Sequence, residues 1–228
     1  MFKDSMRGLD KLFEKDIPEG SVILIAGIPG TLKSGFVHQV LSNHLTKTKK
    51  FGVYATLEEG KESHLRNMKA LGIKKIDSLQ IFDYSDIRKE WKAEEESLDM
   101  VRITNDIINF YKEKKGDEFS CFALDSLNAL YSLVQSTNFR RDSYHFFNTL
   151  RESNLTSFIT LELVRELGEY EPEYFLADGV IEVGIIETRE DVTRYIQIKK
   201  MRAVKHSMKK HQLTVDDEGL AILGPVYE

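Results

Sequence analysis

The stretch GIPGTLKS, residues 27–34, combines glycines, a lysine and a hydroxyl side chain in an order that suits phosphate binding. A phosphate-binding loop needs a buried strand, a glycine-rich turn whose amides point inward, and a helix whose N-terminus favours anions. Its lysine reaches the β- and γ-phosphates, and the next Ser or Thr hydroxyl coordinates Mg²⁺. The sequence therefore predicts a nucleotide site with Mg²⁺. Its residues are Gly27, Ile28, Pro29, Gly30, Thr31, Leu32, Lys33, Ser34 and Gly35, of which Ser34 is a metal ligand.

Leu32 departs from the usual loop, which has glycine directly before the lysine. Leucine keeps the backbone amide but adds a Cβ and an isobutyl group close to the phosphates or to the neighbouring helix. A right-handed backbone would tolerate leucine, whereas a left-handed one costs about 1–2 kcal/mol. A plain strand–turn–helix is the alternative interpretation, and hydrolysis stays open.

Carboxylates follow three of the apolar runs. Asp125 ends FSCFALD, where it is placed to hold Mg²⁺ through water, as a Walker B aspartate does. Glu58 and Glu59 follow the run FGVYATL, and either could polarise the water that attacks the γ-phosphate. The alternative for this pair is a solvated helix N-terminus, where acids are favoured anyway. Glu162 in FITLELV could sense the γ-phosphate.

A basic segment, KKMRAVKHSMKKH, spans residues 199–211. A charge run of this kind is usually a solvated hairpin arm. Lys200, however, shares a predicted strand face with Ile196 and Ile198, so it is not aimed simply at solvent. Lys200 and Arg202 could instead reach the phosphates of a neighbouring subunit, as an arginine finger does.

Short apolar runs alternate with amphipathic segments, which predicts βαβ units around a parallel sheet. The runs expected as core strands are Val22–Ala26, Phe51–Ala55, Leu79–Phe82, Phe119–Leu124 and Thr156–Leu163. Helices are expected at 34–45, 61–71, 100–111 and 144–150, with a charged, irregular insertion at 85–97. Two C-terminal hairpins are expected from 180–186 with 192–200, and from 213–215 with 220–222. We expect one domain over residues 1–228: an α/β core with a largely parallel sheet and appended antiparallel strands.

Composition limits the function classes. The 228 residues carry 32 basic and 37 acidic side chains, a formal charge of −5 that argues against a mainly nucleic-acid partner. The single cysteine, Cys121, excludes an internal disulfide and lies in an apolar run, so we expect a buried core thiol. No apolar run is long enough for membrane insertion and no signal segment is visible. A cytoplasmic location is expected.

Several stretches together resemble the KaiC-like branch of the RecA superfamily, in particular its single-domain archaeal-type members. They occur in the family's order along nearly the whole chain. The matching stretches are GLDKLF at 8–13, IPEGSVILIAGIPGTLKS at 17–34, YATLEEG at 54–60, HLRNMKALG at 64–72, FALDS at 122–126, LADGVIEV at 176–183 and KMRAVKH at 200–206.

The resemblance implies a RecA-like P-loop core that binds ATP and Mg²⁺ between the subunits of a hexameric ring. It implies Lys33 and Ser34 as the Walker A pair, with Asp125 as the Walker B aspartate. The role of catalytic glutamates falls to Glu58 and Glu59. Lys200 and Arg202 correspond to the basic pair that acts on the next protomer's site. Ala203, like Leu32, replaces a family glycine.

Three functions remain open at this point. The leading one is a slowly hydrolysing regulatory ATPase, read by an unidentified protein partner; self-phosphorylation is a variant for which no acceptor stands out. The second is a switch that holds ATP without turnover, as in relatives associated with the archaeal motor. The third is an accessory ATPase of DNA recombination. Arg140 and Arg141, in an expected loop, support this function, whereas the acidic segment 165–175 argues against it because it would repel phosphates.

Overall fold

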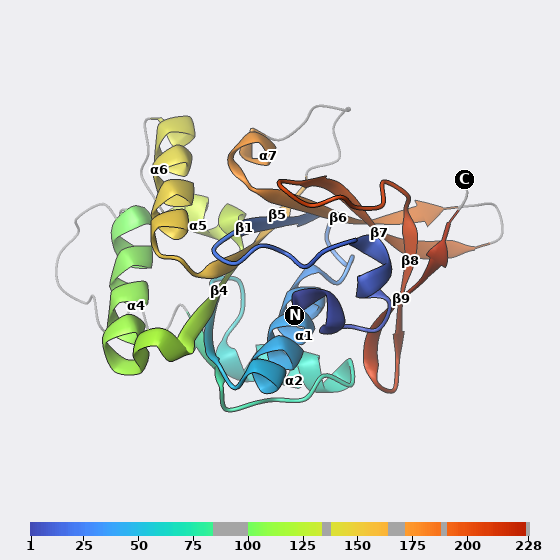
Figure 1. Ribbon diagram of the computed structural model, residues 1–228, viewed down its shortest axis with the longest axis horizontal. Coiled ribbons are helices and arrows are strands. Elements are labelled where there is room, and N and C mark those ends of the chain that lie inside the picture. The colour runs from blue at the N-terminus through green and yellow to red at the C-terminus, as the bar shows by residue number, and fades with distance from the viewer. Residues whose placement is uncertain (84–99, 134–137, 164–171, 188–190, 227–228) are drawn as a thin grey trace.

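The computed structural model describes residues 1–83, 100–133, 138–163, 172–187 and 191–226 (Figure 1). Within these residues nine strands form one sheet in the order β3-β2-β4-β5-β1-β6-β7-β8-β9. The expected insertion at 85–97 lies outside the described residues. The strands are β1 (Val22–Gly27), β2 (Phe51–Thr56), β3 (Leu79–Asp83), β4 (Phe119–Asp125), β5 (Thr156–Glu162), β6 (Gly179–Glu187), β7 (Val192–Met201), β8 (His211–Asp216) and β9 (Gly219–Pro225).

The sheet changes from parallel to antiparallel at β6. Strands β1 to β6 pair in parallel, whereas β7 pairs antiparallel with β6 and the β8–β9 hairpin continues the sheet. This confirms the expected architecture, including both C-terminal hairpins. Every residue of β1 and β2 is buried, as continuous apolar runs in a sheet covered on both faces require.

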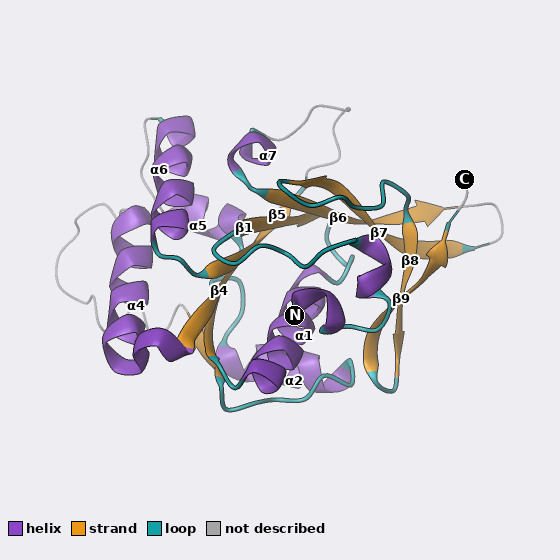
Figure 2. Ribbon diagram, in the orientation of Figure 1, coloured by secondary structure: helices purple, strands orange, loops and turns teal. Residues whose placement is uncertain are grey.

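Helices cover both faces of the sheet, as Figure 2 shows. Alternation along β1 separates two cores: Ile23 and Ile25 face the helices α1 (Lys33–Thr48) and α2 (Lys61–Ala70). Val22 and Leu24 belong to the core on the other face. The helices of that second face are α4 (Met100–Lys115), α5 (Leu127–Leu133) and α6 (Phe139–Glu152), followed in the chain by the short α7 (Glu173–Leu176).

The N-terminal segment closes the core on the α1 side. Two short 3₁₀ helices, Phe2–Asp4 and Leu9–Leu12, bury Phe2, Leu9 and Leu12 in that core. Cys121 is fully buried as expected, and burial raises the pKa of its thiol to about 12.

Helix α6 begins earlier than the sequence pattern indicated. Asn138 caps it, its side chain accepting a hydrogen bond from the amide of Arg141 at 3.1 Å. Arg140 and Arg141 therefore lie in the first turn of a helix, and the expectation that they belong to a DNA-contacting loop is wrong. Most of the second expected loop lies in 164–171, outside the described residues.

Candidate nucleotide site

Two glycines give the loop between β1 and α1 a backbone path that other residues could not follow without strain. A Cβ on Gly27 would lie 2.2 Å from the carbonyl oxygen of Val183 in β6, so only glycine allows this strand to pass so close. Gly30 is left-handed, with φ of 80°, and a Cβ there would meet nothing within 4 Å. Thr31 Oγ1 closes the turn by donating to the carbonyl of Ile28 at 2.7 Å.

Lys33 folds back over this loop among three carboxylates. Its Nζ donates to the carbonyls of Gly27 at 3.0 Å and Ile28 at 3.2 Å. Partial burial lowers the pKa of Lys33, and the charges of Glu162, Asp125 and Glu58 oppose that shift. Three carboxylates predicted from separate parts of the sequence therefore lie around the ammonium group of Lys33.

Leu32, the N-cap of α1, is left-handed, with φ of 72° and ψ of 28°. Of the two backbone conformations considered for Leu32 from the sequence, the protein adopts the left-handed one, which costs about 1–2 kcal/mol. The side chain is half-buried and packs against the core on the α1 side. That contact offsets part of the strain.

Asp125 lies at the carboxyl end of β4 with both oxygens occupied. Tyr54 donates to Oδ2 at 2.7 Å and Thr160 donates to Oδ1 at 2.5 Å. Burial raises the pKa of Tyr54 well above its ordinary value, and Ser34, which lies close to the same hydroxyl, opposes that shift. Tyr54 thus lies between the two predicted metal ligands. Tyr54 and Thr160 are not predicted from the sequence as site residues; the signal for each is a polar group inside a buried strand.

The tandem glutamates point to different partners. Glu58 is exposed and accepts a hydrogen bond from Ser126 Oγ, next to Asp125. Glu59 accepts from two residues of α2, His64 at 3.1 Å and Asn67 at 2.9 Å. Of the two, it is Glu58 whose charge acts on Lys33.

Glu162 lies beside the loop because β5 pairs with β1, in a register that sets Glu162 opposite Gly27. Asn128 fixes this strand end: its Oδ1 accepts from the Glu162 amide at 2.7 Å, and its Nδ2 donates to the Glu162 carbonyl at 3.1 Å. A further residue missed from the sequence is Arg194 of β7, whose Nε donates to the carbonyl of Gly30 at 3.2 Å.

Lys200 and Arg202 do not join this site within the chain. Lys200 lies opposite Val180, and its Nζ donates to the carbonyl of Ala177 at 2.6 Å. Arg202 pairs with Asp178 at 2.7 Å, and Asp178 Oδ2 accepts from the amide of Val22. Burial opposes ionisation of Asp178, but these bonds and the one from Arg151 lower its pKa overall. Arg202 is thus anchored through Asp178 at the first residue of β1, and the ammonium group of Lys200 is held at the carbonyl of Ala177.

β1 itself separates the basic pair from the loop. It spans Val22 to Gly27 at about 3.3 Å per residue, so its two ends are about 16 Å apart. Lys200 and Arg202 lie at the opposite end of this strand from the phosphate loop.

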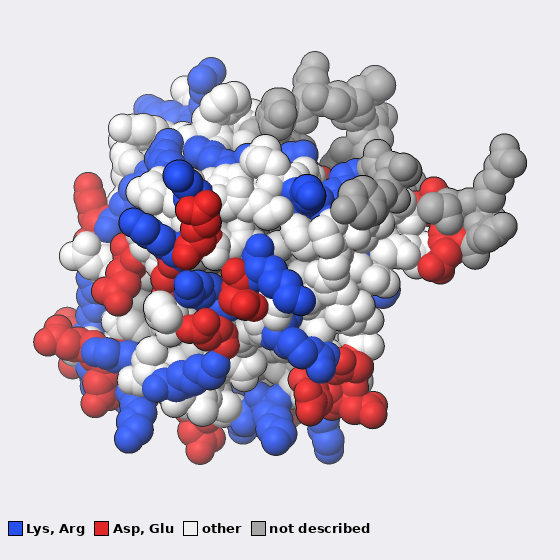
Figure 3. All heavy atoms as spheres, turned by 45° about the vertical axis from the view of Figure 1, so that its right-hand side comes forward, with Lys and Arg blue, Asp and Glu red and all other residues white. Residues whose placement is uncertain are grey.

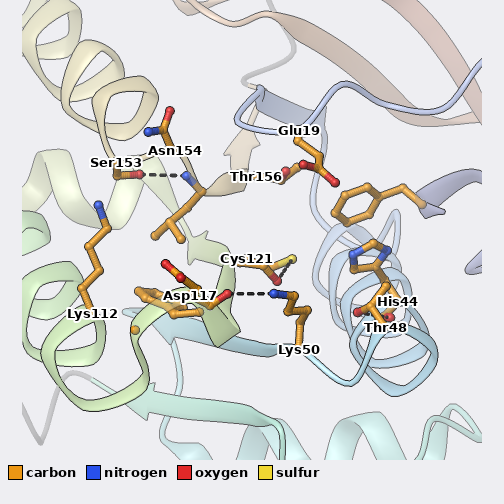
Figure 4. Close-up of a pocket in the computed structure, with 15 residues that line it drawn as sticks. Glu19, His44, Thr48, Lys50, Lys112, Asp117, Cys121, Ser153, Asn154 and Thr156 are labelled. Atoms are coloured by element: carbon orange, nitrogen blue, oxygen red, sulfur yellow. Dashed lines mark hydrogen bonds between the residues drawn. The ribbon is translucent and has the colours of Figure 1, made fainter.

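In the part of the chain that the structure describes, neither the face drawn in Figure 3 nor the pocket at the amino ends of β4 and β5 indicates a second nucleotide site. Figure 3 shows Lys and Arg interspersed with Asp and Glu over the visible face. A pocket of about 600 Å³ opens at the amino ends of β4 and β5, where Lys50 Nζ donates to the carbonyl of Asp117 at 2.9 Å (Figure 4). Ligands of parallel sheets bind at the carboxyl ends of the strands, so this pocket is on the wrong side.

The residues fit ATP with Mg²⁺. Ser34 and Asp125 offer oxygen ligands, which Mg²⁺ prefers, and phosphate and water complete its usual shell. The part of the chain that the structure describes holds no cluster of three or more His, Cys, Asp or Glu side chains able to bind a metal by itself. In the same residues no helix is long and apolar enough to cross a membrane.

Strand order and loop place the chain in a fold class. With β5 between the loop strand and the Asp125 strand, the sheet has the arrangement of a RecA-like P-loop ATPase core. Residues 3–227 match the family described as "ATPase: KaiC", and the chain belongs to this family of nucleotide-binding ATPases.

The relatives include short and long proteins. The chain is 29% identical over 230 residues to a UPF0273 protein of Aeropyrum pernix, covering 96% of this chain and 92% of the relative. It is 29% identical over 226 residues to circadian clock protein KaiC3 of Synechocystis, covering 95% of this chain but 44% of the relative. The chain thus spans less than half the length of that clock protein. A KaiC-like protein of the archaeon Pyrococcus horikoshii superposes with a TM-score of 0.77 at 25% identity, covering 96% of both chains.

Proposed function

We propose that this protein is a slowly hydrolysing regulatory ATPase that works as a homo-oligomeric ring, with ATP at the subunit interfaces. The observation that carries the proposal is the convergence of Asp125, Glu58 and Glu162 on Lys33 at the end of β1. One cation and several carboxylates at a phosphate loop are what phosphoanhydride hydrolysis requires.

In this proposal Lys33 binds the β- and γ-phosphates after leaving the carbonyls of Gly27 and Ile28. Ser34 and Asp125 would hold Mg²⁺, Asp125 through water, and the bound ion would supply positive charge against the phosphate oxygens. Glu58 polarises the attacking water, because its carboxylate lies on the Lys33 side of the turn and is exposed.

The position of Lys200 and Arg202 supports the proposed ring. Within one chain they lie at the end of β1 remote from the loop, so they cannot serve the site of their own chain. A head-to-tail assembly would bring them to the next protomer's phosphates, and head-to-tail contacts that close generate rings. From the family resemblance we propose that the ring is a hexamer and that a regulatory protein partner binds it.

A switch that holds ATP without turnover is the second candidate. The left-handed Leu32 favours it, because the strain falls in the turn that must present its amide to phosphate. Neither candidate needs nucleic acid, and the helical position of Arg140 and Arg141 removes the main support for a DNA function.

ATP binding and single-turnover hydrolysis with Mg²⁺ test the two candidates, using the native chain, Leu32→Gly and Lys33→Ala. Binding and phosphate release by the native chain, both lost in Lys33→Ala, support the ATPase. Turnover only after Leu32→Gly identifies the switch. No ATP binding by the folded native chain contradicts both.

A further inference from the structure

Two buried histidines form a hydrogen-bonded chain behind the nucleotide site. His38 Nδ1 lies 2.9 Å from His64 Nε2, and His64 Nδ1 lies 3.1 Å from Glu59 Oε1. His38 belongs to α1 and His64 to α2, and their exposed fractions are 1% and 0%. The ring of Tyr54, which binds Asp125, lies 4.6 Å from that of His64. The mechanism proposed above uses neither histidine.

The chemistry of the three groups fixes the direction of both bonds. A carboxylate only accepts, so His64 donates from Nδ1 to Glu59 and its Nε2 carries a lone pair. That lone pair accepts from Nδ1–H of His38. Burial lowers the pKa of both imidazoles, that of His38 to about 3, so both rings are neutral near pH 7. Each ring is therefore the Nδ1–H tautomer.

The chain of bonds ends on the turn that carries Glu58. Glu59 is fixed through its side chain by His64 and Asn67, and through its main chain by Thr56, whose Oγ1 donates to the Glu59 carbonyl at 3.1 Å. Glu58 is the preceding residue, and its carboxylate meets Ser126 instead. Holding Glu59 against α2 therefore leaves Glu58 directed into the nucleotide site.

We propose that His38, His64 and Glu59 are positioning residues that aim Glu58 at the attacking water and tie its position to α1, the helix that begins with Lys33 and Ser34. This inference rests on the proposed function, because it assigns the water-polarising role to Glu58. A carboxylate displaced by about 1 Å costs on the order of 100-fold in rate, so such an anchor matters.

Glutamine variants of the two glutamates separate their roles. Glu58→Gln removes the general base and is expected to lower kcat on the order of 100-fold or more. Glu59→Gln still offers an oxygen to His64, so it is expected to keep most of the native kcat, whereas Glu59→Ala loses the anchor. Equal, large losses in Glu58→Gln and Glu59→Gln would overturn the inference, because Glu59 would then be a base itself.

Two substitutions of His64 test its two hydrogen bonds separately. Asparagine places an N–H donor at the Nδ1 position and keeps the bond to Glu59, while glutamine reaches only the Nε2 position, toward His38. Both variants leave a buried group unpaired, so both are expected to lower Tm. We expect His64→Asn to keep most of the native kcat and His64→Gln to lose on the order of tenfold, with the KM for ATP unchanged in both.

A double variant excludes a purely structural effect. In the Glu59→Ala background His64→Gln is expected to lower kcat no further, because its partner is already gone. Equal kcat losses in His64→Asn and His64→Gln, or a loss that persists in the Glu59→Ala background, would contradict positioning.

The tautomers can be measured without turnover. Two-bond ¹⁵N–¹H NMR correlations at neutral pH are expected to show His38 and His64 as Nδ1–H tautomers, and an Nε2–H form of His64 would overturn the inference. Failure of the proposed function looks different: a native chain that binds ATP without hydrolysing it contradicts the ATPase, while the tautomers still decide whether the chain of hydrogen bonds exists.

Discussion

Tyr54 donates its hydroxyl proton to Oδ2 of Asp125 over 2.7 Å, from the strand adjacent to that of Asp125. The contact joins the end of β4 to the phosphate-loop side of the sheet, since Ser34 lies close to the same hydroxyl. The position of the carboxylate predicted to hold Mg²⁺ therefore depends on a tyrosine inside the core.

Tyr54→Phe is expected to lower the free energy of unfolding by about 1–3 kcal/mol, because it leaves one oxygen of a buried carboxylate without its donor. The affinity for Mg²⁺-ATP should fall as well. Urea unfolding and nucleotide titration measure the two effects. Tyr144→Phe is the matched control, as Tyr144 is 52% exposed. Equal free energies of unfolding for the two variants would show that the Tyr54 hydroxyl does not stabilise the fold.

Leu32→Gly and Leu32→Ala are expected to differ in stability. Glycine removes left-handed strain of about 1–2 kcal/mol but loses the packing of leucine and adds about 0.5–1 kcal/mol of chain entropy, so it should be near neutral. Alanine keeps the strain and loses the packing, so it should be less stable than the native chain. Denaturant midpoints check this order, and an alanine variant as stable as the glycine variant would contradict it.

Ala203→Gly is expected to stabilise the protein by about 0.5–1 kcal/mol. Ala203 is exposed and left-handed, with φ of 62°, so glycine removes strain and no packing is lost. Thermal unfolding of native and variant chains measures the gain. A loss of stability would contradict this expectation, because the methyl group of Ala203 would then make a contact that outweighs the strain.

Mixing two inactive variants tests the ring. Glu58→Gln has a defective site and an intact basic pair, and Arg202→Ala the reverse. In a ring mixed at random from equal amounts, about one quarter of the interfaces combine an intact site with an intact Arg202, so about a quarter of the native rate should return. Phosphate release before and after mixing by dilution from denaturant measures this. Without recovery in mixed oligomers, Arg202 does not act on a neighbour.

Stability should fall on acidification below pH 6.5. The pKa of His38 is about 3 in the folded protein and near 6.5 when unfolded, so the unfolded chain binds more protons between these values. The free energy of unfolding then drops by up to about 1.4 kcal/mol per pH unit for each such histidine. His64 contributes with the same sign. Among the described residues, Glu59 and Tyr54 are titratable groups packed against this pair, and the charge of Asp125 also acts on His64.

His38→Leu should flatten this dependence by up to one proton. Urea unfolding at pH 6.5, 5.5 and 4.5 compares the slopes of the native chain and the variant. His145→Leu on α6, outside the buried pair, serves as the control. Parallel slopes for native and His38→Leu would mean that His38 is protonated in the folded protein.

Residue type and spacing are enough to predict the class of fold and a phosphate-binding loop. VILIAG, FGVYAT and FALD are continuous apolar runs because their strands are covered on both faces, and the Lys33–Ser34 pair follows the first of them at fixed spacing. These features are local in the chain, so they can be recognised without coordinates. The start of α6 was misjudged because its cap, Asn138, precedes polar residues that give no apolar period.

The arrangement of the site residues depends on the tertiary structure. It separated Glu58 from Glu59, because His64 binds one of them from another helix, and it paired His38 with His64 across 26 residues of sequence. It also gave Leu32 its left-handed backbone and set Arg202 at the far end of β1. Contacts between distant segments set side-chain direction, backbone handedness and strand register. These features therefore cannot be predicted from the type and spacing of residues along the chain.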